Sequence, residues 1–234
     1  MKCNTLTPLR RAMTGFSLLE VSMVLLIMGF LLGSVVQPFG AQLLDRQRAQ
    51  TRTQLYEIRD AVLGFIVANH RFPCPLNAVI SSEQGCSSNH GFVPADILGI
   101  EGSIDDQGAL LDGWGKPILY SVTDTDSDGD GLADFTTLRG MQNAGMQKLA
   151  PAFEICSSTA GCGRVRANQV PLVLVSRGAS VSDQSPDEIE NTDLDNRFVS
   201  KDIDQSGTAQ YDDIVVWLSE SVLYTRLIQA RVLP

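Results

Sequence analysis

The sequence predicts an α+β fold, in which one long N-terminal helix packs on an antiparallel β-sheet. The chain opens on an apolar stretch of helical character, and helical periodicity then continues to about residue 70. Short apolar runs rich in β-branched residues follow, separated by Gly- and Pro-containing turns. A long helix followed by a series of strands is typical of α+β domains. At 234 residues the chain has room for one medium-sized core.

The first helical segment is long enough to span a bilayer. Residues 16–36 form an apolar run that would measure about 31 Å as a helix, close to the thickness of the hydrocarbon core. The only charges before it are Lys2, Arg10 and Arg11, which place the N-terminal side in the cytoplasm. We therefore expect residues 16–37 to be a transmembrane half of the N-terminal helix, after a basic segment at 1–15.

The second helical segment, residues 38–70, is amphipathic. Pro38 removes one intrahelical hydrogen bond and is expected to kink or open the helix. Beyond it, one stripe should carry the face on which a head domain packs, while the arginines lie mostly off that stripe and are expected to be solvated. The stripe consists of Leu44, Thr51, Leu55, Ile58, Val62, Phe65 and Ile66.

Residues 71–234 are expected to form the head domain. Strands are predicted from Pro117 to Val122 and in the apolar runs near residues 170–176 and 211–219, followed by a helix from about residue 220. Trp114, in a Gly-rich turn, is expected to plug the core. The acidic stretch 179–197 is predicted to be a surface loop without strands.

Four cysteines of the head fall into two local pairs. Three pairings are possible, but closeness in sequence favours local closure. Neither pair has the two-residue gap of a zinc knuckle and no histidine flanks them usefully, so zinc is the weaker interpretation. Two disulfides would indicate an oxidising compartment. The four residues are Cys74, Cys86, Cys156 and Cys162.

One acidic residue lies inside the apolar run. Glu20 has no Lys, Arg or His near it, since none occurs between Arg11 and Arg46. A carboxylate within a membrane segment costs roughly 3 kcal/mol and indicates function by default. Cleavage after Gly15 would create a new ammonium group on Phe16, and this group would pair with Glu20 of a neighbouring subunit.

The stretch RRAMTGFSLLEVSMVLLIMGFLL resembles the N-terminal methylation motif of type IV pilins and type II secretion pseudopilins. The resemblance implies a leader ending at Gly15, N-methylation of Phe16 and subunit docking through Glu20. It also implies a bacterial inner-membrane protein with its head in the periplasm. The expected partners are homologous filament subunits, a prepilin peptidase and the inner membrane.

The charge balance argues against nucleic-acid binding, and the motifs favour a structural subunit over an enzyme. The net charge is −9, and it becomes −12 without the basic leader, so no basic face is available for nucleic acid. No phosphate loop or hydrolase motif is present, and the only histidines are His70 and His90. We expect a structural subunit, of minor or specialised kind given the size of the head. The alternative is a membrane-anchored periplasmic calcium-dependent adhesin or hydrolase.

The stretch DTDSDGDGLADF, residues 124–135, predicts a structural Ca²⁺ site. Alternating carboxylates before a glycine turn suit the six to eight oxygen ligands of Ca²⁺, and magnesium is less suited to such a loop. It resembles thrombospondin type 3 loops, and the resemblance to pseudopilins also implies calcium here. The candidate ligands, in registers that begin at either the first or the second acid, are Asp124, Asp126, Asp128, Asp130, Leu132 and Asp134.

A weaker calcium candidate is the stretch DIDQSGTAQYDD, residues 202–213. Its oxygen-bearing residues fall at offsets 1, 3, 5 and 12 of a calcium loop, with glycine at offset 6. A polar turn before the strand near Tyr211 is the favoured interpretation. The residues concerned are Asp202, Asp204, Ser206, Gly207 and Asp213.

Overall fold

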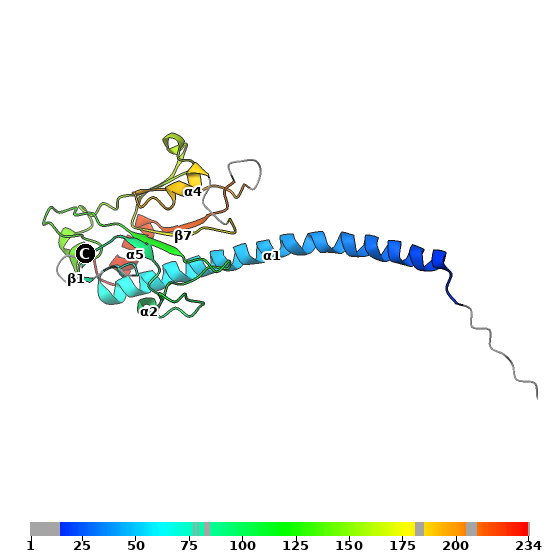
Figure 1. Cartoon of the computed structure of the whole chain (residues 1–234). Helices are drawn as coiled ribbons and strands as arrows, with labels where there is room; N and C mark the ends of the chain where they lie inside the picture. The colour runs from blue at the N-terminus through cyan, green and yellow to red at the C-terminus, as the bar shows by residue number, and fades with distance from the viewer. Residues whose placement is uncertain are drawn as a thin grey trace, which may run out of the picture. The chain divides into compact units, whose positions relative to one another are not determined.

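The structure is a computed structural model, and it describes residues 15–76, 78, 80–81, 85–180, 185–204 and 210–233, without the side chains of 34–39, 41 and 80–81. It shows an α+β protein with an antiparallel sheet and several helices (Figure 1). The chain divides into two compact units, Met1–Leu44 and Asp45–Pro234. We describe each unit by itself.

Helix α1, Leu18–Asn69, begins in the first unit and has 52 residues. Its start is capped by Ser17, whose Oγ accepts the backbone N–H of Glu20 at 3.2 Å. The backbone stays helical through Pro38, so the helix does not open there. The predicted end near residue 70 agrees with Asn69.

The first half of α1 presents apolar side chains that nothing within its own unit covers. Every large apolar side chain from Phe16 to Leu32 is exposed, and Leu18 is 91% accessible. Within the described part of the chain, no helix combines the length and hydropathy needed to cross a membrane. The transmembrane assignment of residues 16–37 is therefore not confirmed.

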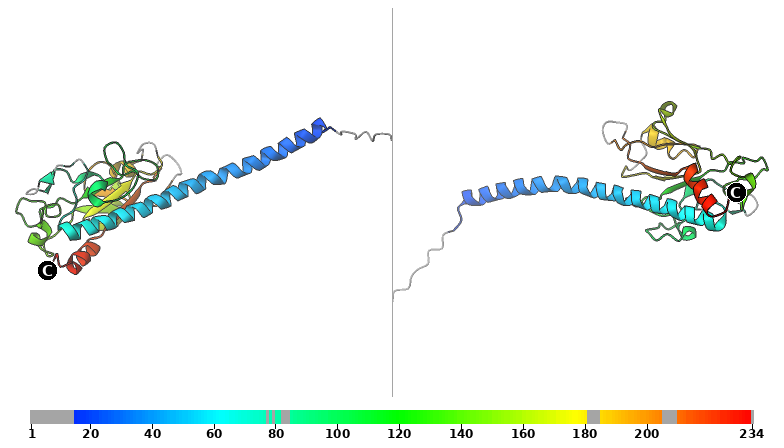
Figure 2. Two further views of the ribbon diagram at one scale, coloured as in Figure 1. Left: turned by 90° about the horizontal axis from the view of Figure 1, so that it is seen from below. Right: turned by 180° about the vertical axis from the view of Figure 1, so that it is seen from behind.

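The second unit is built around a four-stranded sheet. Its order is β3 (His90–Phe92), β4 (Leu119–Val122), β7 (Leu172–Ser176) and β9 (Ile214–Leu218), and each neighbouring pair is antiparallel. The last three strands and the C-terminal helix confirm the predicted elements. That helix, α5 (Glu220–Gln229), lies beside the C-terminal end of α1 in both views of Figure 2.

The predicted stripe of α1 packs into the main core. Leu55, Ile58, Val62 and Ile66 have no exposed surface, and they share the core with residues of β4, β7 and β9. Leu223 and Leu227 of α5 complete it. At the ends of the stripe the burial is only partial, at Leu44 and Phe65.

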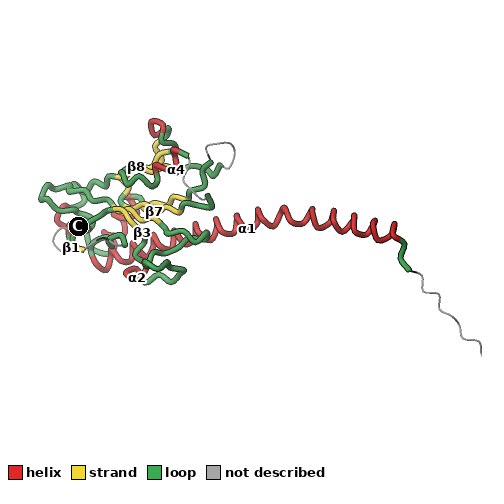
Figure 3. The backbone as a smooth tube through the Cα atoms, viewed as in Figure 1, coloured by secondary structure: helices red, strands yellow, loops and turns green. Residues whose placement is uncertain are grey.

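A second, three-stranded sheet has the order β6 (Val165–Val170), β5 (Phe153–Cys156) and β8 (Arg197–Val199). β5 pairs with β8 in parallel, although the sequence predicted antiparallel pairing alone. Beside β8 lies α4 (Pro186–Glu190), as Figure 3 shows, so the stretch 179–197 is not all loop. Ser185 caps α4 in a capping box with Glu188, which explains why a helix forms in this acidic segment.

The remaining elements are short. They are β1 (Ile80–Ser81) and β2 (Gly85–Cys86), which pair with each other, the helices α2 (Ala95–Leu98) and α3 (Gly140–Ala144), and the 3₁₀ turn Ala160–Cys162. Both expected disulfides are present. Their Cα atoms are 5.4 Å apart for Cys74–Cys86 and 4.8 Å apart for Cys156–Cys162.

The Gly-rich turn around Trp114 fastens the head to α1. Thr51 Oγ accepts the N–H of Gly113 at 3.0 Å, and Gln47 Nε2 donates to the Gly113 carbonyl at 3.0 Å. A Cβ on Gly113 would lie 2.8 Å from Thr51 Oγ, so the close approach requires glycine. The Asp112 carboxylate closes the turn by accepting the N–H groups of Trp114 and Lys116 at 2.9 Å. Trp114 itself packs against the main core, as expected.

Tyr120 provides a direct test of this core. Its side chain is fully buried, and its hydroxyl donates to the Pro73 carbonyl at 2.9 Å. Tyr120→Phe leaves that carbonyl without its donor, and we expect it to lower the free energy of unfolding by about 1–2 kcal/mol. Denaturant unfolding measures the change. The exposed Tyr56→Phe is the matched control and should have no effect; equal stability of both variants would contradict the structure.

Candidate assembly motif and metal-binding loop

The predicted processing site lies just before α1. Gly15 and Phe16 precede the helix, both are exposed, and Phe16 is 81% accessible. The space where a Cβ of Gly15 would project is open, with no atom within 4 Å. The peptide bond between the two residues therefore lies outside regular secondary structure and between exposed residues, as proteolytic cleavage requires.

Glu20 lies in the first turn of α1. With Ser17 as the cap, Glu20 is the third residue of the helix, where a carboxylate is stabilised by the positive end of the helix dipole. The pattern Ser17-Leu18-Leu19-Glu20 matches a capping box, a signal that the sequence analysis did not use. The first cation of α1 is Arg46, so a charge partner for Glu20 within the helix is far away along the chain.

The acidic loop after β4 brings three of its predicted ligands together. Carboxylate oxygens of Asp126, Asp128 and Asp130 lie within 4.8 Å of one another. The loop winds around Asp126: its Oδ1 accepts the N–H of Gly129 at 2.7 Å, and its Oδ2 accepts the N–H of Gly131 at 2.8 Å. Both glycines have positive φ angles, +81° and +87°, which permit the tight turn.

This geometry separates the two predicted registers. The Gly131 bond to Asp126 makes Asp126 the first residue and Gly131 the sixth of a calcium-type loop. Asp124 lies outside the group of three carboxylates. The Leu132 N–H donates to Asp130 Oδ1 at 2.9 Å, which continues the same winding.

Two carboxylates of the loop lie in different environments, which shift their pKa values in opposite directions. The N–H of Gly131, with those of Gly129 and Asp130, holds the pKa of Asp126 below its usual value. Asp134 is buried and accepts the Ser127 N–H at 2.6 Å, and burial raises its pKa, with a further rise from the charges of Asp128 and Asp126. A cation bound among these carboxylates would offset the repulsion between their negative charges.

The weaker calcium candidate stays a prediction, because the structure describes only part of it. Ser206 and Gly207 lie outside the described residues. Asp202 is exposed, whereas Asp213 is buried and accepts a hydrogen bond from Asn191 Nδ2 at 2.8 Å.

Asp213 instead lies in a buried group of acids with Glu188 and Asp212. Asp212 accepts the backbone N–H and the hydroxyl of Ser180 at 2.8 and 3.0 Å. Glu188 accepts the Asp212 N–H at 3.1 Å. Sequence reasoning missed this group because Glu188 comes from α4, and only the Ser185-x-x-Glu188 capping pattern signalled that helix.

His90 has a packing role. Its Nδ1 lies 2.9 Å from Ser121 Oγ, and its ring packs against Phe153 and Phe198, which also contact each other. Burial lowers the pKa of His90. Ser121 is only 5% exposed, whereas His90 is half-buried.

Comparison with known proteins gives no relative: no family model matches the chain, and neither curated proteins nor solved structures yield a significant match.

Proposed function

We propose that this chain is a structural subunit, of minor or specialised kind, of a type IV pilus or type II secretion pseudopilus. It assembles through α1 after cleavage following Gly15 and N-methylation of Phe16. One observation carries the proposal. The pattern Gly15-Phe16 with Glu20 stands at the start of a 52-residue helix whose first half exposes every large apolar side chain up to Leu32.

The exposed apolar side chains need a cover. Contiguous exposed apolar surface of this extent indicates an interaction site, because its exposure to water is unfavourable. In the proposed assembly, the helices of homologous subunits supply that cover. Before assembly the protein would associate with the bacterial inner membrane, with the head in the periplasm, and a prepilin peptidase would remove residues 1–15 on the cytoplasmic side.

Glu20 has a specific part in this proposal. Cleavage creates an ammonium group on Phe16, four residues before Glu20. Two charges in apolar surroundings are costly unless they pair, so the ammonium of one subunit and Glu20 of the next would be satisfied together only in the assembly. The Ser17 cap fixes where the helix starts and so where the carboxylate projects.

We also propose that the acidic loop binds one structural Ca²⁺. The grouping of Asp126, Asp128 and Asp130 supports this, as do the Gly131 turn and the nearby Asp134. Carboxylate oxygens that accept one backbone N–H keep lone pairs for a cation. The Leu132 carbonyl would add a ligand. The bound ion would fix the loop that follows β4.

The first test concerns processing. We expect the protein purified from its native source to begin at Phe16 and to carry one methyl group on its α-amine. Intact-mass and N-terminal peptide mass spectrometry measure both. A mature chain that begins at any other residue would contradict the proposed motif.

The second test separates the charge of Glu20 from its place in the helix cap. Glu20→Gln keeps the shape of the side chain but removes the charge, so cleavage should continue while incorporation into filaments falls at least tenfold. Ser17→Ala, which weakens the cap alone, is the control and should assemble nearly normally. Equal losses of filament incorporation in both variants would contradict the charge pairing and leave Glu20 with a helix-capping role alone.

The third test concerns calcium. Adding Ca²⁺ to chelator-treated protein should raise its melting temperature, because a ligand that binds only the folded state stabilises it. Asp128→Asn should abolish most of that rise, whereas Asp96→Asn, an exposed acid on α2, should not. An unchanged melting temperature for the wild type with and without Ca²⁺ would refute the site.

A further inference from the structure

Two grooves run along α1 within the second unit, one on each side of a ridge formed by Ala49 and Thr53. Both residues line both grooves. The acidic groove has a volume of about 560 Å³, and its charged side chains are Glu57 on α1 and Glu101 and Asp112 on the facing loop. The cationic groove has a volume of about 520 Å³, with Arg48, Arg52 and Tyr56 along its helix wall.

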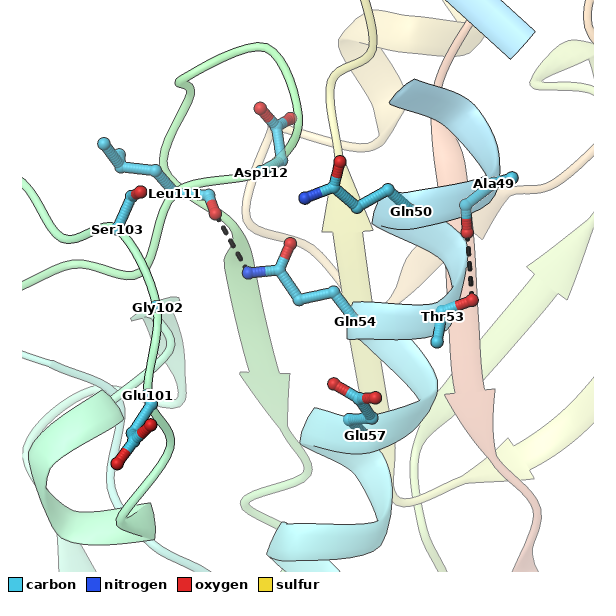
Figure 4. A pocket seen from close by; sticks show the side chains of 10 residues that line it. All are labelled: Ala49, Gln50, Thr53, Gln54, Glu57, Glu101, Gly102, Ser103, Leu111 and Asp112. Atoms are coloured by element: carbon cyan, nitrogen blue, oxygen red, sulfur yellow. Dashed lines mark hydrogen bonds between the residues drawn. The ribbon is translucent and has the colours of Figure 1, made fainter. Parts of the chain in front are cut away.

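The acidic groove has two carboxylates that the fold does not use. Figure 4 shows Gln54 and Glu57 on the helix, facing the loop that carries Glu101. Gln54 Nε2 donates to the Leu111 carbonyl at 3.0 Å, and Asp112 is occupied by its own turn and by the Ser176 hydroxyl at 2.6 Å. Glu57 and Glu101 are exposed, and neither forms an ion pair within the described part of the chain.

In the cationic groove, the incompletely paired side chains are arginines instead of carboxylates. Arg48 reaches Asp45 through one nitrogen at 3.5 Å, while its other terminal nitrogen is buried and has no hydrogen-bond acceptor among the described residues. Arg52 is exposed, one helical turn further on, and has no ion pair with any described acid. Arg59 is held over the Tyr56 ring at 5.0 Å and bonded to Asp60, so it continues the basic side of the helix.

Cations at this position are unusual for the chain. The protein has a net charge of −9, yet Arg46, Arg48, Arg52 and Arg59 fall within 14 consecutive residues. Among the described residues, Arg52 therefore has no ion-pair partner and Arg48 has only Asp45, while carboxylates without ion pairs lie on the neighbouring side of the same helix. Complementary charges of this kind select partner and orientation more than they add affinity.

We propose that the cationic groove of one copy of this chain receives the Glu57–Glu101 side of the acidic groove of the next copy. The contact is heterologous, because the two surfaces differ and lie side by side on one helix. In a pair, one copy then keeps a free acidic groove and the other a free cationic groove, and repeated heterologous contacts that do not close give an open helical filament. The inference rests on the proposed function and names the head-domain surfaces through which neighbouring subunits recognise each other.

Crosslinking of two single-cysteine variants tests the pairing. Cys3 is removed with residues 1–15, and the other four cysteines are already in disulfides. Chains with Arg52→Cys and Glu57→Cys, processed so that they begin at Phe16, are mixed in detergent, the detergent is diluted, and a short bismaleimide is added. We expect crosslinked dimers in the mixture and few in either variant alone. Self-crosslinking of one variant as strong as in the mixture would overturn the heterologous contact.

Charge reversal provides the second readout. Arg52→Glu and Glu57→Arg should each raise the protein concentration needed for sedimentation about threefold at low salt, because each places like charges in contact. The combined variant restores opposite charges and should return to the wild-type value. Lys148→Glu, an exposed reversal outside both grooves, is the control and should change little.

The outcomes separate the two proposals. Wild-type filaments without mixed crosslinks, or a combined variant no better than the single ones, would overturn the groove pairing alone. A wild-type chain that never sediments as filaments would overturn the proposed function.

Discussion

The structure depends on how the apolar side chains of α1 are covered. In its second half, Leu55, Ile58, Val62 and Ile66 are fully buried under the four-stranded sheet and α5. In its first half, every large apolar side chain up to Leu32 is exposed. The same helix therefore packs into the core of the head and, in its first half, presents apolar side chains that its own unit leaves exposed to solvent. Assembly of several copies is the physical consequence that we propose.

The head is fastened to α1 by hydrogen bonds as well as by apolar packing. Gly113 is held through both its N–H and its carbonyl by side chains of α1. The next strand, β4, leads directly into the acidic loop, where the Asp134 N–H donates to the Thr125 carbonyl at 3.0 Å. The placement of that loop thus follows from the packing of β4 on α1, and an ion bound in the loop would stabilise a segment already anchored at its base.

Local patterns in the sequence predicted much of this fold. The stripe on α1, the strands β4, β7 and β9, the helix α5 and both disulfides each depend on neighbouring residues or on periodicity. The parallel pairing of β5 with β8 was not predictable, because it joins segments about 40 residues apart. The long sequence separation also explains why the grouping of Glu188, Asp212 and Asp213 was not predicted. Glu188 lies on α4, and only a capping pattern indicated that helix.

The candidate sites likewise combine features that local sequence predicts with features that only the fold determines. Sequence alone located the acidic loop and left two registers open; backbone N–H groups directed at Asp126 favour one of them. The motif around Glu20 was visible from the start, but its coincidence with the Ser17 cap required the helix boundary. In the acidic groove, Glu101 and Asp112 come from a loop that folds back beside the helix, and no local pattern reveals that.

Electron cryomicroscopy of the processed protein after removal of detergent tests the central claim most directly. The account predicts filaments in which the first halves of α1 from neighbouring copies pack against one another along the axis, with the heads outside. Particles that remain single subunits, or filaments in which residues 16–32 stay exposed at the surface, would contradict it.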